Sequence, residues 1–237
     1  MSYFIERRYI NDATHEKLTF ESLLKNNISI ILGEPASGKT YQLENYKELN
    51  PKKSIFVELM FIDDDEQMNE EIDVVLLDSI DEALSENDSD KALKRELSKY
   101  IKKCKEINPN VKFVITCRYV EWKEIFEEEL KSIDKDLNVF SIEELSEENI
   151  NDILKQKSVN ENEFWEFIKQ NYLEQLLKNI LMVIYLIDNF DKYKGKSLKY
   201  FEIYEEIIKE NLVAETDNER KSRLLKLSPD KMFDISS

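Results

Sequence analysis

Eight consecutive residues near the start of the chain have the types and the spacing that hold a polyphosphate. Residues 33–40 read Gly-Glu-Pro-Ala-Ser-Gly-Lys-Thr and contain two of the three glycines in the chain. A loop of this kind turns successive backbone N–H groups towards phosphate oxygens, and the helix that begins in it adds its dipole. The lysine then reaches the terminal phosphates, and the threonine hydroxyl binds Mg²⁺. We therefore expect a nucleoside triphosphate to be held by Gly33, Glu34, Pro35, Ala36, Ser37, Gly38, Lys39, Thr40 and Tyr41, with Thr40 also a metal ligand.

Acidic residues at the end of a second apolar run are the candidate metal ligand and catalytic groups. Residues 72–77 are mostly apolar and end at Asp78. Ligands bind outside the carboxyl ends of the strands in open α/β folds, so Asp78 is predicted to hold Mg²⁺, directly or through water. Asp81 and Glu82 follow about one turn later, and one of them, with Glu82 preferred, would orient and deprotonate the attacking water. The alternative is that Asp81 and Glu82 only begin a helix, where the dipole favours acidic residues.

A third apolar run, residues 111–116, leads into Cys117 and Arg118. Arg118 is a candidate to contact the γ-phosphate or the carboxylate that polarises water, and Thr116 to orient that water. The alternative for Arg118 is an ion pair with surface carboxylates of an acidic protein. The chain has no Asn-Lys-x-Asp run of the kind that reads guanine, so we expect ATP rather than GTP.

The elements that must position these residues alternate between strands and helices. Helical segments connect the apolar runs, which predicts an α/β fold with a five-stranded, mainly parallel sheet covered on both faces. The expected helices lie at about 16–26, from the glycine loop to 48, at 89–106 and at 120–132. The expected strands are residues 28–32, 54–59, 72–77, 111–116 and 137–140.

After residue 143 the pattern is helical throughout, which predicts a smaller α-helical domain. Helices are expected at 143–156, 161–170, 173–189 and 198–212. The predicted organisation is an N-terminal leader and helix (1–25), a P-loop NTPase domain (26–142), the helical domain (143–215), and a linker or the truncated start of a further domain (216–237).

The composition and the net charge argue against two classes of binding partner, nucleic acids and membranes. The chain has 34 basic and 50 acidic side chains, a formal net charge of −16, which argues against binding to phosphate backbones through this region. Its longest apolar run, 180–187, is too short to cross a bilayer, and its start has no apolar signal core. Cys104 and Cys117 show no pairing pattern and are expected to be reduced thiols. A cytoplasmic protein that does not bind membranes is the expectation.

The motifs together resemble the STAND class of NTPases, and most of all its NACHT-like branch. The runs at 31–40, 76–83 and 115–118 are similar to that branch's glycine-rich loop, its Leu-Asp-Gly-Leu-Asp-Glu-like acidic segment and its strand ending in Thr-Ser-Arg. Ser79 stands where a glycine is common, and Cys117 where a serine is common. Both substitutions are small and keep the pattern.

The resemblance extends into the helical part and covers roughly residues 25–212. Residues 140–150 resemble the entry to the family's helical domain, and 201–205 resemble the helix that follows it. Residues 176–182 match the place where relatives usually read Asn-Pro-Leu, with Ile180 instead of the proline. In the family that segment packs near the nucleotide and helps to sense its state, which makes Asn179 a candidate sensor.

The resemblance implies a regulatory ATPase of slow turnover, in which the nucleotide changes the packing of the helical domain and controls oligomerisation. Many bacterial members resemble innate immune receptors that recognise phage proteins, so protein partners or self-assembly are expected. Two other classes stay open: an AAA+-like motor or loader acting on DNA or protein, and a non-catalytic nucleotide-binding scaffold. Sustained turnover of MgATP would exclude the scaffold, and turnover stimulated by DNA would favour the motor.

Overall fold

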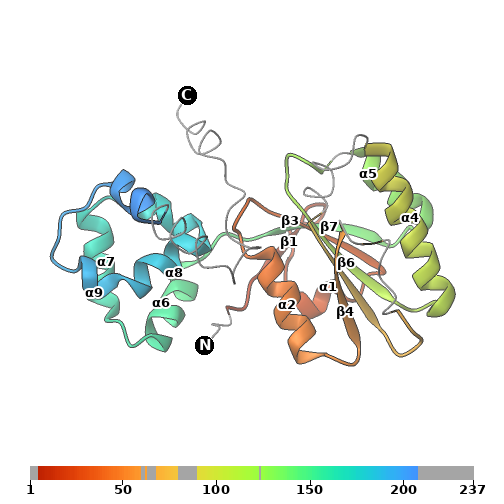
Figure 1. The fold of residues 1–237 in the computed structure, drawn as a ribbon, viewed down its shortest axis with the longest axis horizontal. Coiled ribbons are helices and arrows are strands. Elements are labelled where there is room, and N and C mark those ends of the chain that lie inside the picture. Colours follow the sequence, from red (N-terminus) through yellow and green to blue (C-terminus); the bar gives the residue numbers. More distant parts are fainter. Residues whose placement is uncertain (1–4, 60–61, 63–67, 80–89, 123, 208–237) are drawn as a thin grey trace, which may run out of the picture.

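A seven-stranded sheet forms the centre of the computed structural model, which describes residues 5–59, 62, 68–79, 90–122 and 124–207. The strand order is β2-β1-β7-β3-β6-β5-β4 (Figure 1). The strands are β1 (Tyr9–Asn11), β2 (Lys17–Leu18), β3 (Ile28–Leu32), β4 (Ser54–Glu58), β5 (Val74–Asp78), β6 (Lys112–Cys117) and β7 (Leu137–Ile142).

The five strands β3 to β7 pair parallel with one another and correspond to the five apolar runs of the sequence. Every residue of β3 and of β5 is buried, as expected of strands that have a packed layer on each face. β3 lies between β6 and β7, where Ile30 is opposite both Ile115 and Val139. The strand that precedes the glycine loop is therefore central in the sheet.

The predicted number of five strands is wrong, because the N-terminal segment adds two more. β1 pairs antiparallel with β7 and with β2, so the sheet is mixed. The helix expected at 16–26 is reduced to α1 (Phe20–Leu23). Strands of three and two residues at a sheet edge are too short to show a period of two, which explains why the sequence pattern did not reveal them.

Helices cover both faces of the sheet (Figure 1). Successive strand residues point to opposite faces, so Ile30 joins one hydrophobic cluster and Ile31 another. The Ile30 cluster includes side chains from α4 and α5, and the Ile31 cluster includes side chains from α1 and α2. The helices are α2 (Lys39–Leu49), α4 (Asp90–Ile107) and α5 (Glu124–Ile133).

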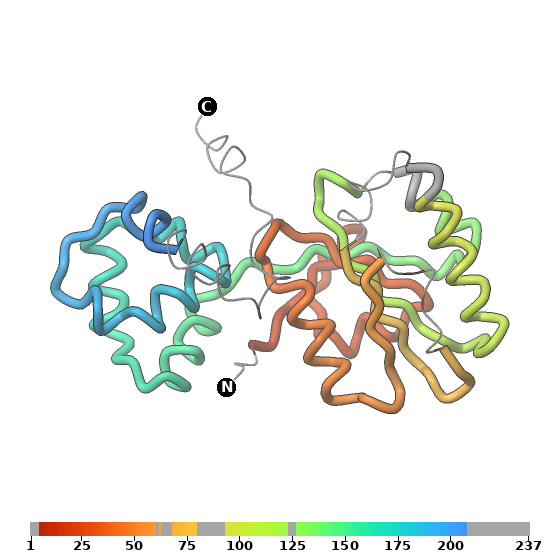
Figure 2. Tube along the Cα trace, viewed as in Figure 1, coloured from red at the N-terminus to blue at the C-terminus, as the bar shows by residue number. Residues whose placement is uncertain are grey.

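The helices that follow β7 pack around a hydrophobic cluster of their own, which contains Phe164, Leu186 and Phe190. Figure 2 shows these helices to one side of the sheet. The domain boundaries at 25, 142 and 215 stay predictions, and residues 216–237 lie outside the described part of the chain. The elements are α6 (Glu147–Gln156), α7 (Glu161–Gln170), η2 (Glu174–Lys178), α8 (Ile180–Asp188) and α9 (Phe190–Tyr193), with residues 200–207 also helical.

The single helix expected over 173–189 is divided at Asn179. This residue has extended backbone angles, φ −104° and ψ 119°, and separates η2 from α8. No helix among the described residues is both long and apolar enough to cross a lipid bilayer.

Candidate nucleotide-binding site

The loop between β3 and α2 has a backbone shape that side chains other than glycine seldom adopt. Ala36 has φ 57° and Gly38 has φ 92°, both in the left-handed region. Gly38 is also the N-cap of α2, so the helix begins directly after it, at Lys39. Because the first N–H groups of a helix have no partner within it, this end of α2 is suited to bind an anion.

A glycine is required at position 33 because neighbouring side chains lie very close to it, and not because of its backbone angles. A Cβ atom at this position would lie 2.4 Å from Cγ2 of Ile142 and 2.7 Å from Oγ of Ser37. The N–H of Gly33 donates to the carbonyl of Cys117 at 3.2 Å, which joins the start of the loop to the end of β6. Any larger residue would force the Ile142 and Ser37 side chains, or the loop itself, to shift.

The ammonium group of Lys39 lies over the loop. Its Nζ donates to the carbonyl oxygens of Gly33 at 2.7 Å and Glu34 at 2.9 Å. These contacts hold the positive charge at the concave side of the turn. Phosphate oxygens bound to the loop would therefore meet both backbone N–H groups and a cation.

Asp78 connects the loop helix to two strands of the sheet. It is the last residue of β5 and only 4% exposed. The Thr40 hydroxyl, from α2, donates to Oδ2 of Asp78 at 2.8 Å, and the Thr116 hydroxyl, from β6, donates to Oδ1. Ser79 N–H in turn donates to Thr116 Oγ1 at 2.9 Å. The structure thus brings together the predicted metal ligands Thr40 and Asp78, although their binding of Mg²⁺ stays a prediction.

The backbone of Ser79 adopts a strained conformation that the sequence pattern did not indicate. Its φ is 64°, in the left-handed region, which a glycine adopts with less strain than other residues. A serine in this conformation costs about 1 kcal/mol relative to a glycine.

The oxygen groups at this edge suit Mg²⁺ and a triphosphate together. Mg²⁺ favours oxygen ligands and is held in such sites by one or two carboxylates together with phosphate oxygens. Among the described residues no group of three or more His, Cys, Asp or Glu side chains could hold a metal ion by itself. The hydroxyl of Thr40 and the carboxylate of Asp78 would therefore share the ion with the nucleotide.

Residues 9–159, from β1 to beyond α6, match the model of the family described as Novel STAND NTPase 3. The chain belongs to this family. It is accordingly a nucleotide-binding NTPase, although the match does not specify the NACHT-like branch.

Two other comparisons add little to this assignment. No curated protein matches the chain. Domain III of the replication initiation protein DnaA from Thermotoga maritima is similar in structure over 77% of this chain and 84% of that chain, with 16% sequence identity and a TM-score of 0.45. We draw no functional conclusion from a likeness of this size.

Of the catalytic candidates of this STAND NTPase, only Arg118 lies in the described part of the chain. Asp81 and Glu82 lie outside the described residues. Arg118 directly follows β6, and its carbonyl accepts from the N–H of Trp122 at 3.0 Å. It is therefore at the same sheet edge as Asp78 and the loop, but its contact with a γ-phosphate stays a prediction. Tyr41 lies in the first turn of α2 and is half-buried.

Asn179, the candidate sensor, has a structural role. Its side-chain oxygen accepts from the N–H groups of Leu181 at 2.9 Å and Met182 at 3.3 Å, which caps α8. The neighbouring Ile180 does approach the loop, since its Cγ2 would lie 3.7 Å from a Cβ atom on Gly38. The segment thus packs against the loop through Ile180, while Asn179 shapes the helix.

Arg7 is a residue of this site that no motif indicated. Its side chain is 4% exposed, and its Nη1 donates to the carbonyl of Ser37, in the loop, at 2.7 Å. Burial lowers the pKa of Arg7, but an arginine side chain keeps its charge in proteins. Nothing in the local sequence distinguishes it from the exposed Arg8 next to it, so only the fold could reveal this contact.

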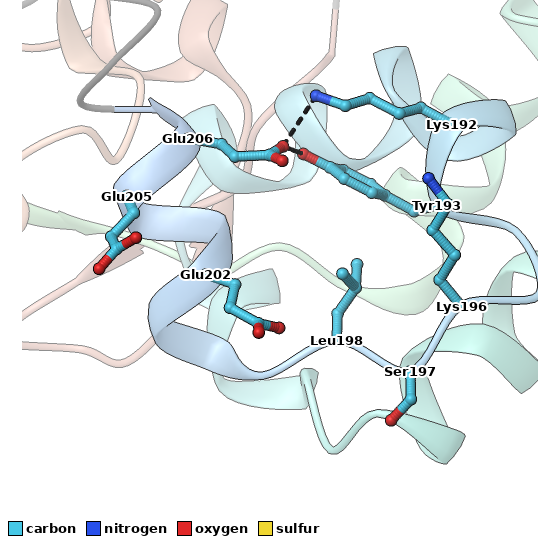
Figure 3. Close-up of a pocket in the computed structure, with 8 residues that line it drawn as sticks. All are labelled: Lys192, Tyr193, Lys196, Ser197, Leu198, Glu202, Glu205 and Glu206. Carbon is cyan, nitrogen blue, oxygen red and sulfur yellow. Dashed lines mark hydrogen bonds and ion pairs between the residues drawn. The ribbon is translucent and has the colours of Figure 1, made fainter.

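A separate open pocket of about 570 Å³ lies in the helical part (Figure 3). Glu206 accepts from Lys192 at 2.8 Å and from the Tyr193 hydroxyl. Burial and hydrogen bonds with Glu206 and Tyr185 raise the pKa of Tyr193, while the hydrogen bonds from Lys192 and Tyr193 lower the pKa of Glu206. Three glutamates and two lysines line the pocket, so it has no excess of positive charge for a polyphosphate. This pocket is therefore less suited to a polyphosphate than the loop, where nucleotide binding stays a prediction.

Proposed function

We propose that this chain is an ATP-binding, slowly hydrolysing regulatory switch of the NACHT-like kind. The observation that carries the proposal is the hydrogen bond from Thr40 to the buried carboxylate of Asp78, beside the loop that holds Lys39. A threonine from the loop helix thus meets an acid from the end of β5. In P-loop NTPases a loop Ser or Thr and a strand-end Asp together hold Mg²⁺, which supports the proposal.

The proposed division of labour follows the sequence motifs. Residues 33–41 hold the phosphates, and Thr40 and Asp78 hold Mg²⁺, which neutralises charge on the γ-phosphate and orients it. Glu82, supported by Asp81, orients and deprotonates the attacking water. Arg118 contacts the γ-phosphate and so distinguishes ATP from ADP.

The wider role that we propose is a switch in bacterial defence whose nucleotide state controls oligomerisation. The resemblance of the motifs to NACHT-like receptors supports the defence role. The close packing of Ile180 against Gly38 supports the switch, because a change in the conformation of the loop would displace the start of α8.

Calorimetry of MgATP binding tests the nucleotide site. We expect Lys39→Ala to weaken MgATP affinity by at least about tenfold, or about 1.4 kcal/mol. The matched control is Lys52→Ala, an exposed lysine in the turn after α2, which should leave the affinity unchanged. Glu82→Gln should keep the affinity and lose phosphate release. A folded wild-type protein without affinity for any nucleoside triphosphate in the presence of Mg²⁺ would refute the proposal.

Size measurement in two nucleotide states tests the switch. The wild-type protein is sized with MgADP and then with a non-hydrolysable ATP analogue. We expect the ATP-like state to favour a larger assembly. Identical monomers in both states, at concentrations that saturate the site, would rule out nucleotide-controlled self-assembly.

A further inference from the structure

The first described residues of the chain lie between the phosphate loop and the helical part. Ile5 is 6% exposed and belongs to the hydrophobic cluster of the helices that follow β7. Its carbonyl accepts from Nε2 of Gln42, a buried residue of the loop helix α2, at 2.9 Å. Four residues later, Tyr9 pairs with Ile142 in the sheet. Figure 2 shows this segment, in red, along the boundary between the helices and the sheet.

Arg7, in the middle of this segment, bridges two backbone carbonyls that belong to different parts of the molecule. Its Nη1 donates to Ser37 in the loop at 2.7 Å, and its Nη2 donates to the carbonyl of Glu143. Glu143 is the residue at which the chain leaves β7 on its way to α6. A Cβ atom on Gly38 would lie 3.6 Å from the same Nη1. The guanidinium therefore contacts the loop next to Gly38, the N-cap of α2.

We propose that Arg7 is a positioning residue that clamps the phosphate loop to the start of the helical part. The clamp consists of Arg7, Ser37 and Glu143. Its effect on nucleotide binding depends on the proposed function, since it assumes that the loop holds phosphates. Its effect on the arrangement of the helices does not depend on that function.

The physical basis is the cost of a buried charge that loses an acceptor. A hydrogen bond from a charged group stabilises more than one between neutral groups, and breaking it inside the protein leaves the charge without compensation. If the Ser37 carbonyl moves when phosphates bind, Arg7 and Glu143 must move with it or lose that bond. The planar guanidinium donates in two fixed directions, whereas a lysine ammonium is a single compact charge. Ile5 transmits the displacement, because it lies two residues away and packs among the helices.

The variants that test the clamp are Arg7→Met and Arg7→Lys, with Arg8→Met as the control. Arg8 is adjacent and exposed, so Arg8→Met removes the same charge from solvent and keeps the backbone hydrogen bond from the Glu143 N–H to the Arg8 carbonyl. Labels are attached at Leu49→Cys, at the end of α2, and at Tyr172→Cys, in the helical part, where the native side chains are 71% and 84% exposed. The two native cysteines are 0% exposed and so stay unlabelled in the folded protein.

With spin labels at the two sites, pulsed electron–electron double resonance gives the distribution of distances between them, first without nucleotide and then with MgADP. Calorimetry on the unlabelled proteins gives the affinity for MgATP, and thermal melts show that each variant is folded. We expect Arg7→Met to broaden the distance distribution without nucleotide and to weaken MgATP affinity about tenfold. Arg7→Lys should lie between Arg7→Met and wild type, and Arg8→Met should equal wild type in both measurements.

Distributions and affinities that are the same for Arg7→Met and wild type would overturn the clamp. Equal losses in Arg7→Met and Arg8→Met would also overturn it, since they would show an effect of charge alone. If Arg7→Met does not fold, a distance distribution in Arg7→Lys that equals that of the wild type would also overturn the clamp. A wild-type protein that binds no nucleotide would refute the proposed function, while the comparison without nucleotide would still decide on the clamp.

Discussion

At the scale of single residues, the carboxylate of Asp78 is the junction of the site. Its two oxygens accept from hydroxyl groups on two different elements, Thr40 of α2 and Thr116 of β6. A buried charge is costly unless hydrogen bonds compensate it, and these two bonds supply that compensation. Asp78 thus aligns the loop helix with the strands at the sheet edge.

Thr116→Val is the substitution that tests this junction. Valine has nearly the same shape, but it removes the donor to Asp78 and the acceptor of the Ser79 N–H. We expect the free energy of unfolding, measured by urea denaturation, to fall by about 1–3 kcal/mol because two buried polar groups lose a partner. Thr14→Val, at an exposed threonine, should stay within about 0.5 kcal/mol of wild type. Equal losses in the two variants would contradict the role given to Thr116.

At the scale of elements, the sequence predicts what local patterns determine. The apolar run Ile28–Leu32 predicts β3 to the residue, because a strand buried on both faces must be apolar throughout. The glycine loop and the acid at the end of β5 follow from the same kind of apolar run, which explains why the contact of Thr40 with Asp78 could be expected.

What the sequence does not reveal depends on contacts between distant residues. β1 and β2 are short and gain their pairing only from β7 and from each other. The bridge from Arg7 to Ser37 and Glu143 also has no local signal. An apolar run such as the one from Ile180 indicates a helix but not the break at Asn179, since that depends on a single cap.

The start of α8 gives a prediction at this scale. Asn179 has ψ 119°, which a residue before proline favours, and Ile180 is the first helical position, which accepts proline. We expect Ile180→Pro to lower the free energy of unfolding by only about 1 kcal/mol, from lost packing. Val183→Pro removes the N–H that bonds to the Asn179 carbonyl at 3.0 Å and should cost about 3 kcal/mol or more. Urea denaturation of both variants measures the difference, and equal losses would show that this helix start is wrongly assigned.

At the scale of the whole molecule, the net charge distinguishes the proposed switch from a motor that acts on DNA. The formal net charge is −16, with 34 basic against 50 acidic side chains. Attraction to a phosphate backbone requires clustered cations and weakens with salt. We expect MgATP turnover to be the same with and without double-stranded DNA at physiological ionic strength, measured by phosphate release. Stimulation by DNA that disappears as salt is raised would favour the motor instead.

The position of β3 in the sheet affects how the protein forms during its synthesis. Ile30 of β3 is flanked by Ile115 and Val139, which the ribosome adds much later. Pairings between distant residues form late because a long loop must close first. A nascent chain that ends before Leu137 therefore exposes one edge of β3 and leaves an apolar strand unpaired on that side, where chaperones can bind it. We therefore expect nucleotide to stabilise the newborn protein more strongly once β7 has emerged from the ribosome and paired with β3.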